Sequence, residues 1–210
     1  GRMSQVLFNN ERDLGASLVI ESPITFKPFY LRLDAAFVNG TGAYDKEMDN
    51  RKDFIGSLRA SKTFGKFTRF TLAGGVSYYN GAIVQSTPNT YQMIKADDGR
   101  YIYQQITDTA AIGKKYWKRE YFGADMQLTL DYKIGTTILR GEFIAGTNPG
   151  TATGNLPPST LGSDLYMRKF NGAYFYVIQT FKQKTKNNIV HHDIVFKYDW
   201  YDPNTMAGGK

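Results

Sequence analysis

Apolar and polar side chains alternate residue by residue along several long segments of this chain. Between residues 29 and 38, aromatic and aliphatic positions alternate with positions that include Arg32 and Asp34. A repeat of two residues places the two sets on opposite faces of a β-strand. The pattern therefore predicts strands with one apolar face and one face that carries full charges.

Eight segments follow this pattern. They cover residues 12–20, 29–38, 53–61, 67–79, 121–132, 137–145, 172–181 and 190–200. The segment 172–181 is apolar at both sets of positions, so the pattern leaves its facing open. Short predicted turns (21–28, 63–66, 133–136 and 182–188) alternate with long predicted loops (39–52, 80–118 and 146–168). Short turns at one end of the strands and long loops at the other are typical of bacterial outer-membrane barrels.

The charges within the strands lie almost wholly opposite the large apolar residues. A charge that faces lipid costs roughly 2–4 kcal/mol at the bilayer midplane, so a membrane barrel sorts its side chains in this way. A soluble calycin-type barrel has the inverse arrangement, with apolar residues inside, and is the structural alternative. The loop lengths and the aromatic residues near strand ends favour the membrane version. The expected fold is an all-β, antiparallel transmembrane β-barrel.

Composition narrows the class of protein further. Of the 210 residues 41% are hydrophobic, but no run approaches the roughly 18 apolar residues of a membrane helix. The chain has no cysteine, which leaves no disulfide or thiolate metal site. The formal charge is +7, yet Lys and Arg are scattered and no nucleic-acid recognition module is readable, so we expect no nucleic-acid partner.

The two ends of the chain lack the features of a complete barrel protein. Residues 1–3 do not begin a signal peptide, and residues 202–210 read as a loop rather than as a closing strand. We therefore expect residues 1–210 to form a single barrel segment that is incomplete at both ends.

Four short motifs carry a likeness to a known family. They are Glu-Arg-Asp-Leu-Gly-Ala at 11–16, Phe-Val-Asn-Gly-Thr-Gly at 37–42, Asn-Arg-Lys-Asp at 50–53 and Lys-Tyr-Asp-Trp-Tyr-Asp-Pro at 197–203. These motifs resemble strand starts and exits of the phosphate-selective porin O/P family of Gram-negative outer membranes, especially its Bacteroidetes-type members. The resemblance implies a sixteen-stranded barrel, often trimeric, that passes small anions such as phosphate and other solutes. This chain would then supply about half of the barrel wall.

Two sets of charged residues are candidates for solute contact. The predicted pore-lining residues are Arg32, Asp34, Arg59, Arg69, Arg140, Glu142 and Lys197. A basic cluster is predicted at a constriction or at the pore mouth, namely Lys114, Lys115, Lys118 and Arg119. Rings of charge at a constriction set the selectivity of a pore, and the loop 80–118 is the expected constriction. The alternatives for the cluster are a solvated loop end or a site for lipopolysaccharide phosphates.

The predicted inner wall carries more acids than bases, which puts phosphate specificity in doubt. The inward acids are Asp13, Glu21, Asp34, Asp53, Asp125, Asp131, Glu142, Asp193 and Asp199. The inward bases are Arg32, Arg59, Arg69, Arg140 and Lys197. Anion preference would then depend on the basic cluster in the loop.

Other polar clusters give no strong sign of catalysis or of a metal site. His191 and His192 are neighbours on a predicted strand and point to opposite faces, so they cannot share one ion without a bulge. The acidic run 45–53 lacks the pattern of an EF-hand and is either a solvated loop or a weak calcium site. We expect no enzyme activity, no cofactor and no resident metal.

The sequence thus predicts an outer-membrane porin that passes small, anionic, hydrophilic solutes by diffusion. Its expected surroundings are outer-membrane lipid and lipopolysaccharide, and its expected assembly is a homo-oligomer (a trimer) or a part of a larger outer-membrane assembly. The alternative is a closed eight-stranded anchor or interaction barrel whose long loops bind a partner. Eight strands leave no aqueous channel, so the number of strands separates the two functions.

Overall fold

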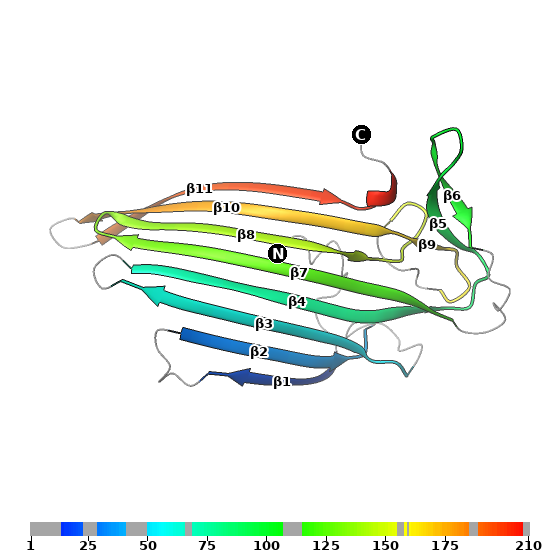
Figure 1. Cartoon of the computed structure of the whole chain (residues 1–210), viewed down its shortest axis with the longest axis horizontal. Coiled ribbons are helices and arrows are strands. Elements are labelled where there is room, and N and C mark those ends of the chain that lie inside the picture. The colour runs from blue at the N-terminus through cyan, green and yellow to red at the C-terminus, as the bar shows by residue number, and fades with distance from the viewer. Residues whose placement is uncertain are drawn as a thin grey trace.

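The protein folds into an antiparallel β-sheet of eight strands in the order β1-β2-β3-β4-β7-β8-β10-β11 (Figure 1). These strands are β1 (Gly15–Glu21), β2 (Phe29–Val38), β3 (Asp53–Phe64), β4 (Arg69–Gln85), β7 (Lys115–Tyr132), β8 (Gly135–Thr147), β10 (Lys169–Lys184) and β11 (Ile189–Asp202). The computed structural model describes residues 14–22, 29–40, 50–65, 69–106, 115–154, 158, 160–184 and 189–207. The all-β, antiparallel architecture expected from the alternating pattern is confirmed.

The eight predicted segments correspond one to one with these strands. The bounds of β2 agree with the prediction, whereas β4 runs on to Gln85 and β7 already begins at Lys115. The two strands pair along this extension, from Gly81 opposite Arg119 to Gln85 opposite Lys115. The predicted loop 80–118 is therefore wrong at both ends. Its outer residues continue the sheet because they pair with each other across the two strands.

The connections between strands are short at one end of the sheet and long at the other end. Only Lys133 and Ile134 separate β7 from β8, and four residues separate β10 from β11. The long connections, from β2 to β3, from β4 to β7 and from β8 to β10, all leave the opposite end, on the right in Figure 1. The predicted alternation of short turns and long loops is thus present in the structure.

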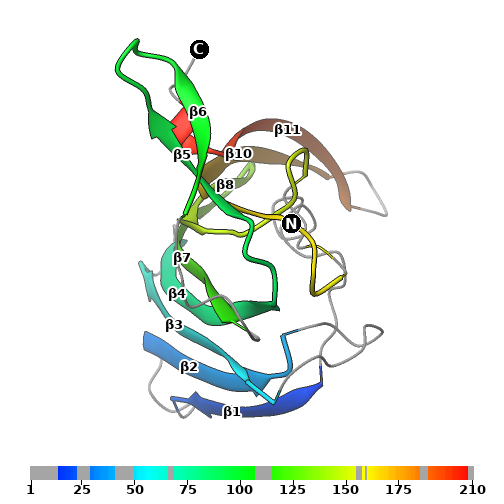
Figure 2. The same cartoon turned by 90° about the vertical axis from the view of Figure 1, so that its right-hand side faces the viewer.

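The long connections contain a second, smaller sheet that the sequence pattern did not predict. It consists of β5 (Thr90–Lys95), β6 (Tyr101–Gln105) and β9 (Leu165–Met167), in the order β6-β5-β9. β5 and β9 are parallel and join the two predicted loops. Figures 1 and 2 show β5 and β6 projecting beyond the end of the large sheet and away from its concave side. The expected constriction by the loop 80–118 stays a prediction.

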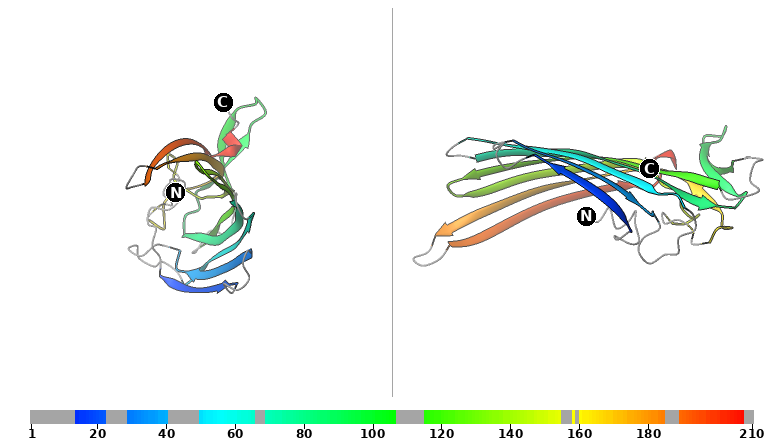
Figure 3. Two further views of the ribbon diagram at one scale, coloured as in Figure 1. Left: turned by 90° about the vertical axis from the view of Figure 1, so that its left-hand side faces the viewer. Right: turned by 90° about the horizontal axis from the view of Figure 1, so that it is seen from below.

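The large sheet is open and curves into an arc, with β1 and β11 at its two ends (Figures 2 and 3). Each of these edge strands pairs on one side only within the described residues, β1 with β2 and β11 with β10. A closed eight-stranded barrel needs a ladder between β1 and β11, and the described strands do not form it. The described residues form a short 3-10 helix, η2 (Thr205–Ala207), and no described helix is long and apolar enough to cross a membrane.

The register divides the sheet into two chemically different faces. Directly opposed residues in antiparallel strands share a face. The apolar face carries the large exposed hydrophobic side chains Leu18, Ile20, Leu31, Leu33, Phe37, Leu58, Leu72, Val76, Phe122, Met126, Phe143, Phe175, Ile194, Phe196, Tyr198 and Trp200. Its described Asp, Glu, Lys and Arg residues are confined to the outer parts of strands, at Lys62, Lys118, Glu120, Lys169 and Asp202.

Candidate functional site

The other face of the sheet, here called the charged face, carries the predicted pore-lining residues. One row of directly opposed residues crosses all eight strands, and its members are Glu21, Arg32, Arg59, Gly75, Asp125, Glu142, Tyr174 and Asp199. Arg140 and Lys197 lie in the next row, and Asp34 lies in the row on the other side. The structure thus places all seven predicted pore-lining residues on one face. Their contact with a solute stays a prediction.

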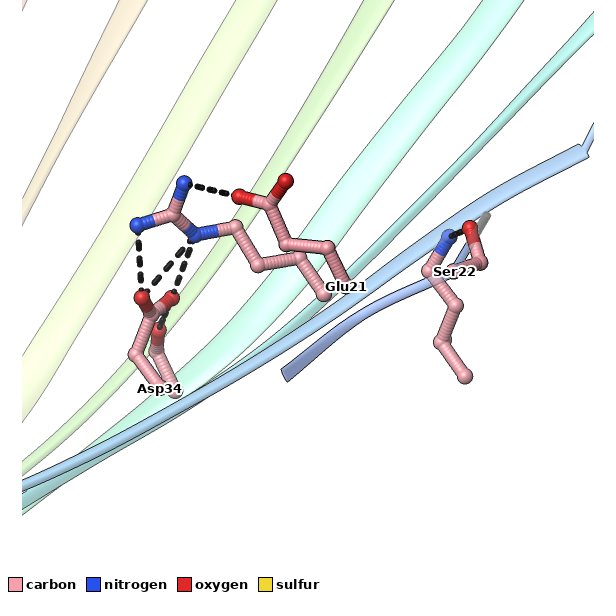
Figure 4. Close-up of polar contacts among 6 residues, drawn as sticks. Glu21, Ser22 and Asp34 are labelled. Atoms are coloured by element: carbon pink, nitrogen blue, oxygen red, sulfur yellow. Dashed lines mark hydrogen bonds and ion pairs between the residues drawn. The ribbon is translucent and has the colours of Figure 1, made fainter. Parts of the chain in front are cut away.

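At the β1 edge of the charged face, Arg32 bridges two carboxylates (Figure 4). Its Nη1 donates to Oε1 of Glu21 at 2.6 Å, and its Nε and Nη2 donate to Oδ1 of Asp34 at 2.9 and 2.7 Å. Ser57 donates to the other oxygen of Asp34. Glu21 and Asp34 point to the side toward which the other strands curve. Because these groups are partly exposed, water and salt screen the bridges, which therefore contribute little to stability.

At the β11 edge, the charges are also paired. Lys197 lies 2.6 Å from Oδ2 of Asp199, and its ammonium group stands over the ring of Tyr176 at 5.1 Å. The neighbouring Tyr174 donates a hydrogen bond to Oε2 of Glu142. The facing of β10, which the pattern left open, is therefore settled: Tyr174 and Tyr176 lie on the charged face, and Phe175 lies on the apolar face.

Between the two edges lies a hollow of about 170 Å³, here called the central hollow. Arg59, Asp125, Arg140, Glu142, Ser57 and Ser77 are among its lining residues. It is the part of the charged face where groups of both signs surround a concave surface. Arg69, by contrast, lies beside Asp131 near the short-turn end of the sheet.

The structure does not bring the predicted basic cluster together. Lys118 and Arg119 are consecutive residues of β7 and therefore lie on opposite faces. Lys118 pairs with Glu120 at 2.7 Å on the apolar side, whereas the Lys115 ammonium stands over the ring of Trp117 at 5.6 Å. Lys114 lies outside the described residues. The sequence pattern had placed this cluster in a loop. Its described members belong instead to β7, where neighbouring side chains point to opposite faces of the sheet.

Arg119 belongs instead to a buried polar cluster at the long-loop end of the charged face. Its Nη2 lies 3.0 Å from Oδ2 of Asp53, donates to the carbonyl of Gly40 at 2.8 Å and also bonds the hydroxyl of Tyr79. Tyr79 in turn donates to Asp53. The side chains of Arg119 and Asp53 are only 6% and 2% exposed. The Arg119 guanidinium is thus enclosed and neutralised, and its role at a constriction or mouth stays a prediction.

An aromatic stack adjoins this buried cluster. The rings of Tyr79 and Tyr121 stack at 4.9 Å, and Phe170 meets Tyr121 edge-on at 5.2 Å. The hydroxyl of Tyr121 donates to Asn148 at 2.9 Å. Buried residues from three strands, β4, β7 and β10, thus form a hydrophobic core cluster of the sheet. The core stabilises the end from which the long connections depart.

Gly81 makes the buried ion pair possible. It lies directly opposite Arg119, and a Cβ atom at Gly81 would come within 2.3 Å of Oδ2 of Asp53. We expect Gly81→Ala to lower the free energy of unfolding by about 1–3 kcal/mol, because the added methyl group displaces the Asp53 carboxylate. Urea unfolding in detergent, followed by tryptophan fluorescence, measures this loss. Gly162→Ala is the control, since nothing lies within 4 Å of that position; an equal loss in both variants would contradict the prediction.

The small sheet holds a separate group of tyrosines. Tyr91 stacks on Tyr166 at 4.8 Å, and Tyr103 meets Tyr166 edge-on at 4.9 Å. The hydroxyl of Tyr103 accepts a hydrogen bond from Nε of Arg168. In the turn between β5 and β6, a side-chain hydrogen bond from Arg100 lowers the pKa of Asp98. These contacts stabilise the small sheet and give no sign of chemistry.

The remaining candidates for metal binding or catalysis do not assemble. His192 contacts Gln183 at 3.2 Å, and Asp193 accepts a hydrogen bond from Thr180. In the acidic run 45–53, residues 45–49 lie outside the described residues, and Asp53 is committed to Arg119. The described part of the chain contains no group of three or more potential metal ligands among His, Cys, Asp and Glu.

Comparison of the chain with family models, with curated proteins and with solved structures gives no match. The functional argument therefore depends on the two faces of the sheet. Sequence reasoning placed Asp125 on the inner wall but did not name it, or Ser77 and Tyr174, as part of a site. The signal that could have found them is the cross-strand register, which puts Arg59, Asp125 and Glu142 in one row.

Proposed function

We propose that this chain forms part of the wall of an outer-membrane porin, with its apolar face toward lipid and its charged face toward a water-filled lumen. The observation that carries the proposal is the exposed apolar face, which continues over all eight strands of the sheet. Soluble monomeric proteins rarely expose contiguous apolar patches larger than a few hundred Å². A lipid bilayer is the surrounding that removes such a face from water.

The sorting of charges supports the same proposal. The described part of the apolar face is free of full charges in the middle of its strands, while Arg59, Asp125, Arg140 and Glu142 lie in mid-strand on the charged face. Charges in mid-strand need water, and an aqueous lumen supplies it. A sheet that curves as an open arc fits the wall of a barrel larger than eight strands, since wider barrels leave an aqueous channel.

The likeness to the phosphate-selective porin O/P family would add a sixteen-stranded barrel, a trimeric assembly and a Gram-negative outer membrane that contains lipopolysaccharide. The anion preference stays a prediction. Of the four residues in the basic cluster, Arg119 is neutralised by Asp53 and Lys118 pairs with Glu120. The solutes that this wall supports best are small and hydrophilic, and their charge is a matter for measurement.

Current through single channels in a planar bilayer under a salt gradient tests the function. We expect discrete open steps from the purified full-length protein that contains this chain. A reversal potential that favours anions would support the basic residues as the selectors, and one that favours cations would transfer selectivity to the inward acids. Absence of conductance from protein that is folded in the bilayer would overturn the porin proposal.

A further inference from the structure

The central hollow contains charges of both signs that do not neutralise each other. Among the described residues, Arg59, Arg140, Asp125 and Glu142 form no ion pair within 4.0 Å. The flanking charges differ: Arg32 pairs with Asp34 at 2.7 Å, and Lys197 pairs with Asp199 at 2.6 Å. Unlike these flanking pairs, the charges of the hollow are therefore available to a solute.

Two glycines lie among the residues of the hollow: Gly123 lines it, and Gly75 belongs to the row of residues that contains Arg59 and Asp125. Gly75 lies between Arg59 and Asp125, and a Cβ atom there would come within 2.9 Å of Cγ of Arg59 and 3.2 Å of Oδ2 of Asp125. A Cβ atom at Gly123 would come within 2.4 Å of the hydroxyl of Ser77. Because both positions lack a side chain, the side chains of Arg59, Asp125 and Ser77 can lie over them, on the face that carries the hollow. The volume of about 170 Å³ admits a small solute rather than one water molecule.

The two carboxylates form the middle of the charge pattern. Asp125 and Glu142 are directly opposed in the register. Like charges in this position destabilise a sheet, so a cation between them would be favoured. Tyr174 donates a hydrogen bond to Glu142 and orients its carboxylate. An ammonium group, with several N–H donors, matches two neighbouring carboxylates.

The two guanidinium groups flank the carboxylates. Arg59 lies on β3, two strands away from Asp125 across Gly75, and Arg140 lies two residues from Glu142 on β8. Adjacent positions on one face of a strand are roughly 7 Å apart. A guanidinium binds a carboxylate through two parallel hydrogen bonds. A molecule that carries an ammonium and a carboxylate a few bonds apart can thus engage both kinds of group at once.

We propose that the central hollow binds small zwitterionic solutes of the amino-acid or short-peptide type, with their ammonium group at Asp125 and Glu142 and their carboxylate at Arg59 or Arg140. This inference rests on the proposed function, because it assigns the hollow to the lumen of a pore. It goes beyond that function by naming the class of solute that the wall retains.

Block of the channel current by glycylglycine tests the inference. We expect the dipeptide to reduce the ion current reversibly, and N-acetylglycinamide, which is of similar size but lacks both charges, to have little effect. Asp125→Asn combined with Glu142→Gln should weaken the block by roughly tenfold or more, since the ammonium loses its charge-assisted hydrogen bonds. Arg59→Gln combined with Arg140→Gln should weaken it as well. Asp98→Asn, in the turn between β5 and β6, is the control. Glycylglycine should block the current through this variant as strongly as the current through the parent protein.

The outcomes separate the two proposals. A conducting channel that both probes block equally, or that the double variants leave equally sensitive to glycylglycine, overturns the zwitterion site and leaves the porin intact. If only the variant with Asp125→Asn and Glu142→Gln loses its sensitivity to glycylglycine, the hollow is a cation site, and the zwitterion proposal is overturned. A protein that conducts no ions overturns both the pore and the site.

Discussion

Asp53→Asn is expected to destabilise the protein by about 3–5 kcal/mol, because it leaves the Arg119 guanidinium buried without its counter-charge. The two side chains are almost fully enclosed, and the pair joins β3 to β7 across Gly81. The amide keeps the size of the carboxylate, so the loss reports charge rather than volume. Urea-induced unfolding in detergent micelles, followed by tryptophan fluorescence, measures the change in the free energy of unfolding.

A double-mutant cycle gives the control. Arg119→Met alone should cost a similar amount, since it leaves the carboxylate of Asp53 buried, but the combined variant should lose much less than the sum of the two. Asp34→Asn serves as the exposed counterpart, because its ion pair with Arg32 is partly open to water and should contribute little to the free energy of unfolding. Additive losses at positions 53 and 119 would show that the two groups do not depend on each other.

The sheet could be predicted from the sequence because two signals agree on most strands. A repeat of two residues marks a strand, and the position of the charges marks its faces. In β7, for example, Phe122 and Met126 alternate with Asp125 and Gln127, and the structure has them on opposite faces. The pattern failed in β10, where both faces are apolar in composition, because Tyr174 and Tyr176 use their hydroxyl groups and ring faces among the charges of the polar side.

The small sheet and the buried ion pair could not be predicted, because both depend on contacts between distant parts of the chain. β5 pairs with β9 across more than seventy residues, from Thr90 opposite Leu165. Arg119 and Asp53 are separated by 66 positions, and each reads in isolation as an ordinary exposed charge. Their meeting requires the register of β3, β4 and β7 and a glycine between them. The pattern of one segment contains none of this information.

The central hollow could be predicted from the sequence only in part. The facing of Arg59, Arg140 and Glu142 was predicted from alternation, so the chemical groups of the site were known. Their grouping was not, because a shift of the register by two residues would keep every facing and change every neighbour. The unpaired state of the charges is likewise a property of the fold: Arg32 lies in the same row as Arg59, yet among the described residues only Arg32 of the two has a carboxylate within 4.0 Å.

The proposed lipid contact of the apolar face leads to the second large effect. Met126 lies in mid-strand on β7, where its neighbours on that face are Gly74 and Gly141, and its side chain is 62% exposed. The small neighbours leave room for a longer side chain, so a substitution there reports the surrounding medium rather than a clash. Gln127 is the next residue of the strand and lies on the charged face.

Met126→Arg is expected to lower the free energy of unfolding in lipid vesicles by about 2–4 kcal/mol, whereas Gln127→Arg should change it by about 0.5 kcal/mol or less. The first guanidinium would enter the hydrocarbon layer, while the second would enter water. Denaturant titration of both variants in vesicles measures the difference between two adjacent positions. If Met126→Arg lowered the free energy of unfolding as little as Gln127→Arg does, the apolar face would lie in water. The proposal that this sheet is a lipid-facing wall would then be wrong.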